Sequence, residues 1–109
     1  MSNPELSRSW ERTASYLLDA RSRVPKIAAA KFENDLVQFE EFLEHNELGL
    51  VSDWLTSIAL ECRPVPVQTL ELLALAEASM GRTKNQRSLD ERLSQLQGKK
   101  YETVLPPAA

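Results

Sequence analysis

Residues 41–54 read EFLEHNELGLVSDW and contain the feature that organises the chain. Four of the fourteen residues are acidic, two are aromatic, and His45 is the chain's only histidine. Apolar residues on both sides of His45 can pack as the two arms of an αα-hairpin. Asn46 suits the N-cap of the second arm, and Glu47 in its first turn would complement the helix dipole. The stretch predicts a corner between two helices, and the rest of the chain bears on whether it is also a site or a protein-binding surface.

Outward from this corner, apolar residues recur at spacings of three and four, which is the helical pattern. Asn3-Pro4 is a helix start and Pro25 a helix end, while Gly81 suits a left-handed stop. Ser88 and Glu91 form a capping box for a further short helix. The predicted helices cover residues 4–25, 25–44, 47–62, 66–80 and 88–97. We therefore expect an all-α, four-helix bundle-like domain over residues 1–98 with a possible short fifth C-terminal helix, and a tail over 99–109.

The two tryptophans and the single cysteine fall on the apolar stripes of these helices. This position favours core packing for Trp10 and Trp54, with an exposed binding anchor as the alternative. Cys62 is predicted to be a small buried hydrophobe. One cysteine gives neither an internal disulfide nor a zinc pattern, and a reducing cytoplasm is the simplest compartment for such a chain. No apolar run approaches the roughly 20 residues that cross a bilayer, and the first residues lack a signal-peptide pattern.

The net charge of −3 hides three blocks of opposite sign. Residues 1–32 and 78–109 each have six basic and three acidic side chains, whereas residues 33–77 have ten acidic side chains and a single Arg63. The middle block thus has a balance of −9, which can steer a basic partner toward it. Like charges one turn apart, such as Glu40 and Glu44, destabilise an isolated helix by roughly 0.2–0.5 kcal/mol per pair. The carboxylates are therefore either a solvated face or a partner surface.

Neither a metal site nor a catalytic site is expected. Metal sites in helical bundles recruit Glu-x-x-His pairs from more than one helix, whereas this chain has one histidine, and Glu41 precedes it by four residues. A pairing of His45 with Cys62 or a serine lacks an accompanying oxyanion motif. We therefore expect a protein that is not an enzyme and has no cofactor.

The segments FLEHNELGLVSDWLTSIALE and PVPVQTLELLALAEASMG resemble small helical immunity proteins of bacterial toxin systems, in particular the MafI-like and contact-dependent growth inhibition immunity families. The resemblance covers about residues 32–81. The matching positions are Phe42, Leu43, Glu44, His45, Asn46, Glu47, Leu50, Leu55, Glu61, Pro66 and Leu73. Trp54, Cys62 and the C-terminal segment have no counterpart in the family pattern.

The resemblance implies a non-catalytic protein that binds and neutralises a cognate toxin domain, frequently a nuclease. Nuclease toxins present basic surfaces for phosphate, and an acidic helical face can cover such a surface. The candidate partner-binding residues are Glu40, Glu41, Glu44, His45, Glu47 and Asp53. No direct contact with nucleic acid or membrane is expected.

Two other functions remain open from the sequence. A helical adaptor or homo-oligomerisation domain would associate through Trp54 or the Leu70–Leu73 face. A nucleic-acid-associated regulator would use the two basic ends, although the C-terminal block has Tyr101 as its only aromatic residue. That basic block could also fold back onto the acidic middle of its own chain.

Overall fold

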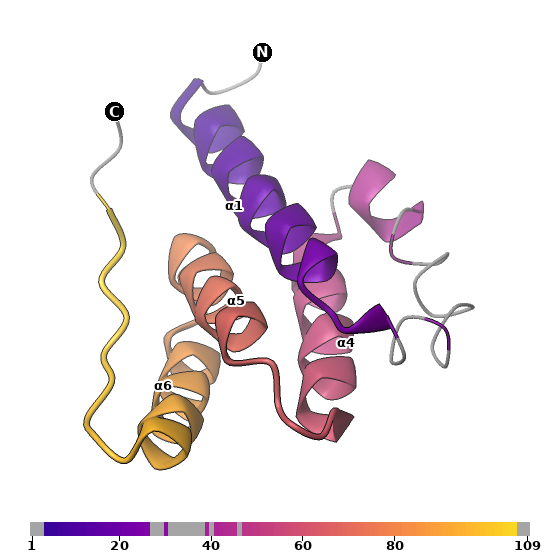
Figure 1. The fold of residues 1–109 in the computed structure, drawn as a ribbon. Coiled ribbons are helices and arrows are strands. Elements are labelled where there is room, and N and C mark those ends of the chain that lie inside the picture. The colour runs from indigo at the N-terminus through magenta and orange to yellow at the C-terminus, as the bar shows by residue number, and fades with distance from the viewer. Residues whose placement is uncertain (1–3, 27–29, 31–38, 40, 46, 107–109) are drawn as a thin grey trace.

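The computed structural model describes residues 4–26, 30, 39, 41–45 and 47–106, and these residues form helices and connecting segments without any strand. The long helices are α1 (Pro4–Ser22), α4 (Leu48–Glu61), α5 (Val67–Ser79) and α6 (Thr83–Gln97) (Figure 1). Residues 41–44 are also helical and precede α4. The prediction of an all-α fold is confirmed.

The ends of the helices follow the sequence signals at most of the described positions. The helices predicted over 47–62 and 66–80 are α4 and α5, each within a residue of its expected ends. Gly81 has a φ of +74° and is the left-handed stop predicted after α5. Most of the helix predicted over 25–44, and the Asn3 and Asn46 caps, lie outside the described residues.

The start predicted for the last helix is wrong. α6 begins at Thr83, directly after the Gly81 turn, so Ser88 lies inside the helix and does not cap it. The turn between α5 and α6 is short, because the left-handed conformation of Gly81 changes the direction of the chain within one residue. The next helix can therefore begin at Thr83, with Arg82 at its N-cap position. Of the three leucines predicted to line this helix, Leu89 and Leu93 are buried and Leu96 is exposed.

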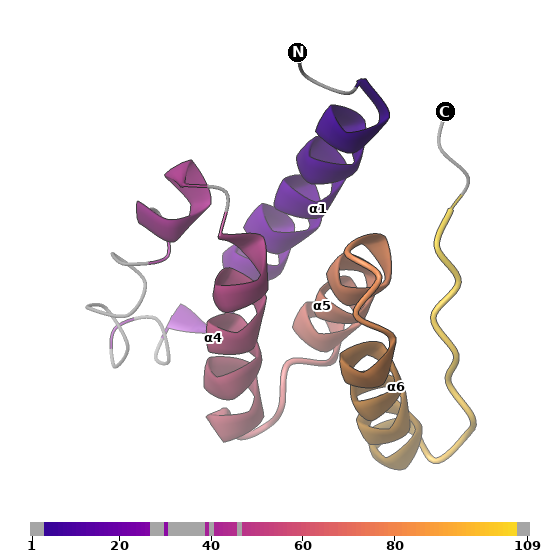
Figure 2. The same ribbon diagram turned by 180° about the vertical axis from the view of Figure 1, so that it is seen from behind.

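Helix α5 lies at the centre of the described bundle and packs against α1, α6 and α4 (Figures 1 and 2). Leu70, Leu73 and Ala74 of α5 are completely buried. Side-chain contacts fix α1 antiparallel to α5, because Thr13 Oγ1 donates to Ser79 Oγ at 2.7 Å and Thr69 Oγ1 donates to the Ala20 carbonyl at 3.4 Å. The core is therefore built around α5.

Trp10 does not pack in the core, contrary to the prediction, and is 45% exposed. Over residues 10–22, where the burial of α1 is described, the buried positions are Thr13, Leu17 and Ala20. Thr13 already contacts Ser79, the last residue of α5, so Trp10 lies one turn beyond the end of its partner helix. The periodicity of α1 places Trp10 on the correct side, but α5 is too short to cover it.

The segment predicted to be a tail is extended over residues 100–106 and is bonded to the bundle (Figure 1). The Thr103 amide donates to Asp90 Oδ2 at 3.0 Å, and the Thr103 hydroxyl also donates to that carboxylate. The Tyr101 amide donates to Ser94 Oγ at 2.8 Å. Because Thr103 is only 9% exposed, this segment is part of the packed structure up to that residue.

Candidate functional site

The predicted corner is formed by backbone hydrogen bonds between residues 41–47. The His45 amide donates to the Glu41 carbonyl at 3.2 Å, and the Glu47 amide donates to the Phe42 carbonyl at 2.9 Å. The second bond spans five residues, as in the Schellman ending of a helix. Glu47 occupies the N-cap position of α4 without a side-chain capping bond, so it does not lie in the first turn as predicted.

Four of the six predicted partner-binding residues lie together at this corner with exposed side chains: Glu41, Glu44, His45 and Glu47. Within the described part of the chain, none of them forms an ion pair with a basic side chain. Glu40 lies outside the described residues. The corner therefore presents three carboxylates to solvent that the described bundle does not neutralise.

An apolar hollow of about 380 Å³ lies beside the acidic corner. Its lining consists of Phe42, Leu50, Asp53, Trp54 and Ser57. The ring centroids of Phe42 and Trp54 are 5.3 Å apart with a 42° angle between the planes, which is a tilted aromatic contact. Leu50 is 52% exposed, and both rings are half-buried. Trp54 is thus half-buried and does not belong to the core, because one part of it packs on Phe42 and another lines the open hollow; its role as a binding anchor stays a prediction.

Asp53, the sixth predicted residue, has a different environment. Its Oδ1 accepts a hydrogen bond from Arg82 Nη2 at 2.8 Å, and Arg82 Nη1 also donates to the Gly49 carbonyl at 2.8 Å. The Asp53 side chain remains 55% exposed. One residue of the basic C-terminal block is therefore folded onto the acidic middle block, as the charge pattern allowed.

Glu77 is the functional-site candidate that the sequence reasoning missed. It is 1% exposed, and its Oε1 accepts a hydrogen bond from the Ser52 hydroxyl at 2.7 Å. Its Oε2 lies 3.3 Å from Arg82 Nε, an ion pair without hydrogen-bond geometry. Burial raises the pKa of Glu77, and the Ser52 hydrogen bond and the Arg82 charge lower it by less.

Local backbone geometry explains why Arg82 reaches Glu77. The Arg82 amide donates to the Glu77 carbonyl at 2.9 Å, and the Gly81 amide donates to the Ala78 carbonyl at 3.1 Å. These two bonds, with the positive φ of Gly81, form a complete Schellman motif. The sequence contains a signal for the burial of Glu77. Glu77 follows Leu70 and Leu73 at helical spacing, on the core face of the helix, and precedes Gly81 by four residues.

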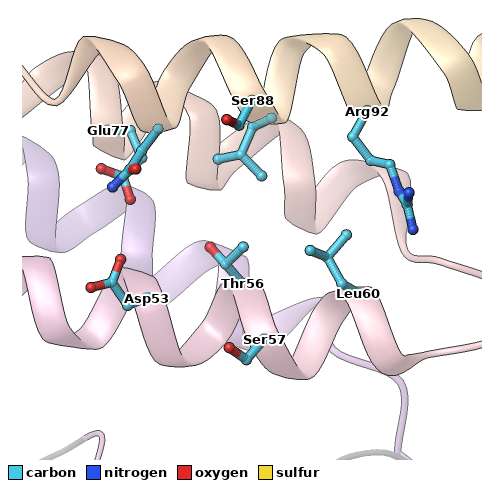
Figure 3. Close-up of a pocket in the computed structure, with 9 residues that line it drawn as sticks. Asp53, Thr56, Ser57, Leu60, Glu77, Ser88 and Arg92 are labelled. Atoms are coloured by element: carbon cyan, nitrogen blue, oxygen red, sulfur yellow. The ribbon is translucent and has the colours of Figure 1, made fainter.

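A second hollow, here called the α4–α6 groove, lies on the other side of Asp53 and Ser57. It has a volume of about 480 Å³. The residues that line it are Asp53, Thr56, Ser57, Leu60, Glu77, Asn85, Ser88, Leu89 and Arg92. Figure 3 shows Asp53 and Glu77 at one end and Arg92 at the other, with Thr56 and Leu60 of α4 pointing toward α6. The groove is polar at its ends and partly apolar between them.

Among the residues that the structure describes, no group of three or more His, Cys, Asp or Glu side chains could hold a metal ion. Cys62 is 7% exposed, and its thiol donates to the Ile58 carbonyl at 3.3 Å, so the prediction of a buried hydrophobe is confirmed. No described helix has the length and apolar character needed to cross a membrane.

Comparisons of the chain with protein-family models, curated proteins and solved structures find no match.

Proposed function

We propose that this protein binds and neutralises a cognate bacterial toxin domain by covering a basic surface of that domain with its acidic corner. The single observation that carries the proposal is the juxtaposition of the exposed carboxylates Glu41, Glu44 and Glu47 with the open hollow at Phe42 and Trp54. A protein interface needs both a charged region that selects the partner and an apolar centre that holds it.

The charged part supports recognition of a basic partner. Three carboxylates within seven residues repel one another, which a purely structural corner has no reason to retain. Opposite charge on a partner relieves this repulsion and increases the rate of encounter more than it increases the affinity. The acidic corner therefore suits fast capture of a basic domain, at a rate that depends on salt concentration.

The apolar part supports tight retention of that partner. Tryptophan is enriched among residues that dominate binding energy, and such residues lie in pockets surrounded by less important contacts. Trp54, Phe42 and the exposed Leu50 offer a hollow for one apolar side chain of the partner. The carboxylates on the neighbouring residues would form the rim of that contact.

The identification of the partner as a toxin domain rests on the resemblance of residues 32–81 to immunity proteins. A nuclease fits the charge complementarity, because nucleases present basic surfaces for phosphate. The mechanism we propose is stoichiometric: the bound protein excludes the toxin's substrate and performs no chemistry itself. His45 would contribute to the rim as an exposed polar group beside Glu44.

The structure weakens the alternative of self-association through α5. Leu70 and Leu73 have no exposed surface, so that face is not available to a second copy. A contact between copies through Trp54 would use the same hollow that we assign to the toxin. The alternative of nucleic-acid binding through the basic C-terminal block is weakened as well. Arg82 of that block forms ion pairs with Asp53 and Glu77, so its charge is not available to a phosphate.

The test is affinity capture from the native cells, followed by toxin protection. The wild-type chain is compared with a variant in which Glu41, Glu44 and Glu47 are changed to lysine. A matched control changes the exposed Glu61, Glu91 and Glu102 to lysine, with the same change in net charge. We expect wild type and control to capture one basic domain at low salt and to abolish its toxicity, and the corner variant to do neither. Equal capture by all three would overturn the proposal.

A further inference from the structure

The α4–α6 groove has opposite charges at its two ends and lies next to the proposed interface. Asp53 and Ser57 line both the groove and the apolar hollow, so a partner that covers the hollow also reaches the groove. At the other end, Arg92 is exposed and lines the groove, and the structure gives it no ion pair with any described residue. Arg92 is thus a guanidinium without a described partner at the edge of a cavity.

The anionic end is less simple than the cationic one. Asp53 Oδ1 is occupied by Arg82, whereas Asp53 Oδ2 makes no hydrogen bond with a described residue and the side chain is half-exposed. The Arg82 guanidinium is shared between Asp53 and the buried Glu77, and it contacts only one of the two Asp53 oxygens. A cationic group in the groove would therefore bind at the free oxygen of Asp53.

The length of the groove sets the kind of occupant. Asp53 and Leu60 are seven residues apart on α4, and Asn85 and Arg92 are seven residues apart on α6. Seven residues of helix rise about 10.5 Å. An extended chain advances roughly 3.3–3.6 Å per residue, so about three residues span this distance. A free amino acid is too short to contact both ends.

We propose that the α4–α6 groove binds an extended peptide segment with a basic side chain at the Asp53 end and an acidic side chain three residues away at Arg92. This inference rests on the proposed function, because the segment belongs to the partner that occupies the neighbouring hollow. The Ser88 hydroxyl lines the groove and provides a hydrogen-bonding group for the peptide backbone, and the Thr56 hydroxyl, which donates to the Ser52 carbonyl at 2.7 Å, can accept a bond from a peptide N–H. Leu60 and Leu89 would contact the intervening side chains.

Arg92, the cation at the far end of the groove, would discriminate between partners. A partner that is uniformly basic would meet repulsion at Arg92, whereas one with an acidic residue at the right distance would gain an ion pair there. Opposite charges in defined places reject wrong partners as well as favour the correct one. Arg92 is therefore a specificity-determining residue, separate from the acidic corner that attracts basic partners in general.

The test uses a probe that does not require the partner. A blocked tetrapeptide, lysine–alanine–alanine–glutamate, is titrated to millimolar concentration into the isotope-labelled protein, and backbone amide shifts are followed by nuclear magnetic resonance. We expect shifts confined to residues 53–60 and 85–92. Arg92→Glu should weaken binding by about fivefold, the size of a surface ion pair. Lys84→Glu, an exposed position on α6 that does not line the groove, should leave binding unchanged.

A charge swap makes the result specific. Arg92→Glu should prefer the peptide with lysine at both ends, whereas Lys84→Glu should not acquire that preference. Absence of shifts in the groove, or equal binding by wild type and Arg92→Glu, would overturn the inference. The corner variant should bind the peptide normally, so failure of the corner in toxin capture and failure of the groove in peptide binding are distinguishable.

Discussion

The acidic corner and the Glu77–Arg82 junction use the same chemistry in opposite ways. Both lie in the acidic block of the chain or against it, and both contain clustered carboxylates. At the junction, Glu77 is buried, accepts a bond from Ser52 and faces Arg82. At the corner, Glu41, Glu44 and Glu47 are exposed and have no basic partner in the described part of the chain. The sign of a charge block therefore does not reveal which charges are available to a partner.

The difference follows from the cost of desolvation. A carboxylate that is removed from water requires compensation, because an unpaired buried charge costs several kcal/mol. At the junction the positive charge of Arg82 provides this compensation. Arg82 also connects three helices, because it precedes α6 and contacts Asp53 of α4 and Glu77 of α5. An exposed carboxylate has no such requirement, so the corner tolerates three of them at a small repulsive cost. The junction carboxylates should accordingly control stability, and the corner carboxylates should control binding.

The largest effect on stability should come from Arg82→Met, which keeps much of the side-chain volume and removes the charge. Loss of Arg82 leaves Glu77 without its counter-ion and Asp53 without its bond, and we expect the free energy of unfolding to fall by about 2 kcal/mol. Arg87→Met on the exposed side of α6 is the control and should change stability by less than about 0.5 kcal/mol. Urea denaturation measures the free energy of unfolding of both variants. An equal loss in Arg82→Met and Arg87→Met would show that the Glu77–Arg82 junction has no special role in stability.

A double mutant sharpens this result. If Arg82 acts by compensating Glu77, Arg82→Met combined with Glu77→Gln should be less destabilised than the sum of the single variants. Neighbouring residues in one network typically differ from additivity by about 0.5–3 kcal/mol. Strict additivity would show that the two side chains do not depend on each other.

The next effect concerns the C-terminal segment. Thr103→Val keeps the shape of the side chain and removes the hydroxyl that donates to Asp90, leaving that carboxylate with one bond fewer. We expect a loss of about 1–2 kcal/mol. Val104→Thr, at a side chain that is 79% exposed, should have no measurable effect. If Thr103→Val left the free energy of unfolding unchanged, as expected for Val104→Thr, the C-terminal segment would not contribute to the stability of the fold.

A smaller effect should appear in the dependence of stability on pH. Because the folded state raises the pKa of Glu77, it binds the proton more tightly than the unfolded chain does. This contribution to stability is fully present below the unfolded pKa of about 4.3 and is lost as the pH rises through the raised folded pKa. Glu77→Gln should remove this part of the pH dependence. Parallel stability–pH curves for the two proteins, measured by urea denaturation, would contradict this assignment.

The smallest stability effect should come from the corner itself. Changing Glu41, Glu44 and Glu47 together to glutamine removes exposed carboxylates that have no described ion pair, so the free energy of unfolding should stay within about 0.5 kcal/mol of wild type or rise slightly. Thermal or urea unfolding gives this value directly. A loss as large as that of Arg82→Met would mean that the corner carboxylates serve the fold.

The sequence predicted the helices wherever local signals were sufficient. The spacing of apolar residues gave α4 and α5, and Gly81 gave the turn between α5 and α6, because glycine there has the left-handed conformation. The start of α6 was wrong because Ser88 and Glu91 match a capping box by residue type alone. Trp10 was wrong because its exposure depends on where another helix ends.

The site was predicted only in part, for the same reason. The exposure of Glu41, Glu44, His45 and Glu47 follows from a polar corner between two helices. The engagement of Asp53 could not be read from its own helix, since Arg82 follows it by 29 residues. Glu77 was counted as one charge among ten, although its position on the core face of α5 marked it as buried. Tertiary pairing, and not composition, separated the two groups of carboxylates.

The central claim is that the corner carboxylates govern encounter with a partner and not folding. The most direct measurement is the association rate constant of the captured partner at low salt, for wild type and for the protein with Glu41, Glu44 and Glu47 changed to glutamine. We expect a fall of about tenfold or more in that rate, with unchanged unfolding free energy and a smaller difference at high salt. An unchanged association rate at low salt would contradict the claim.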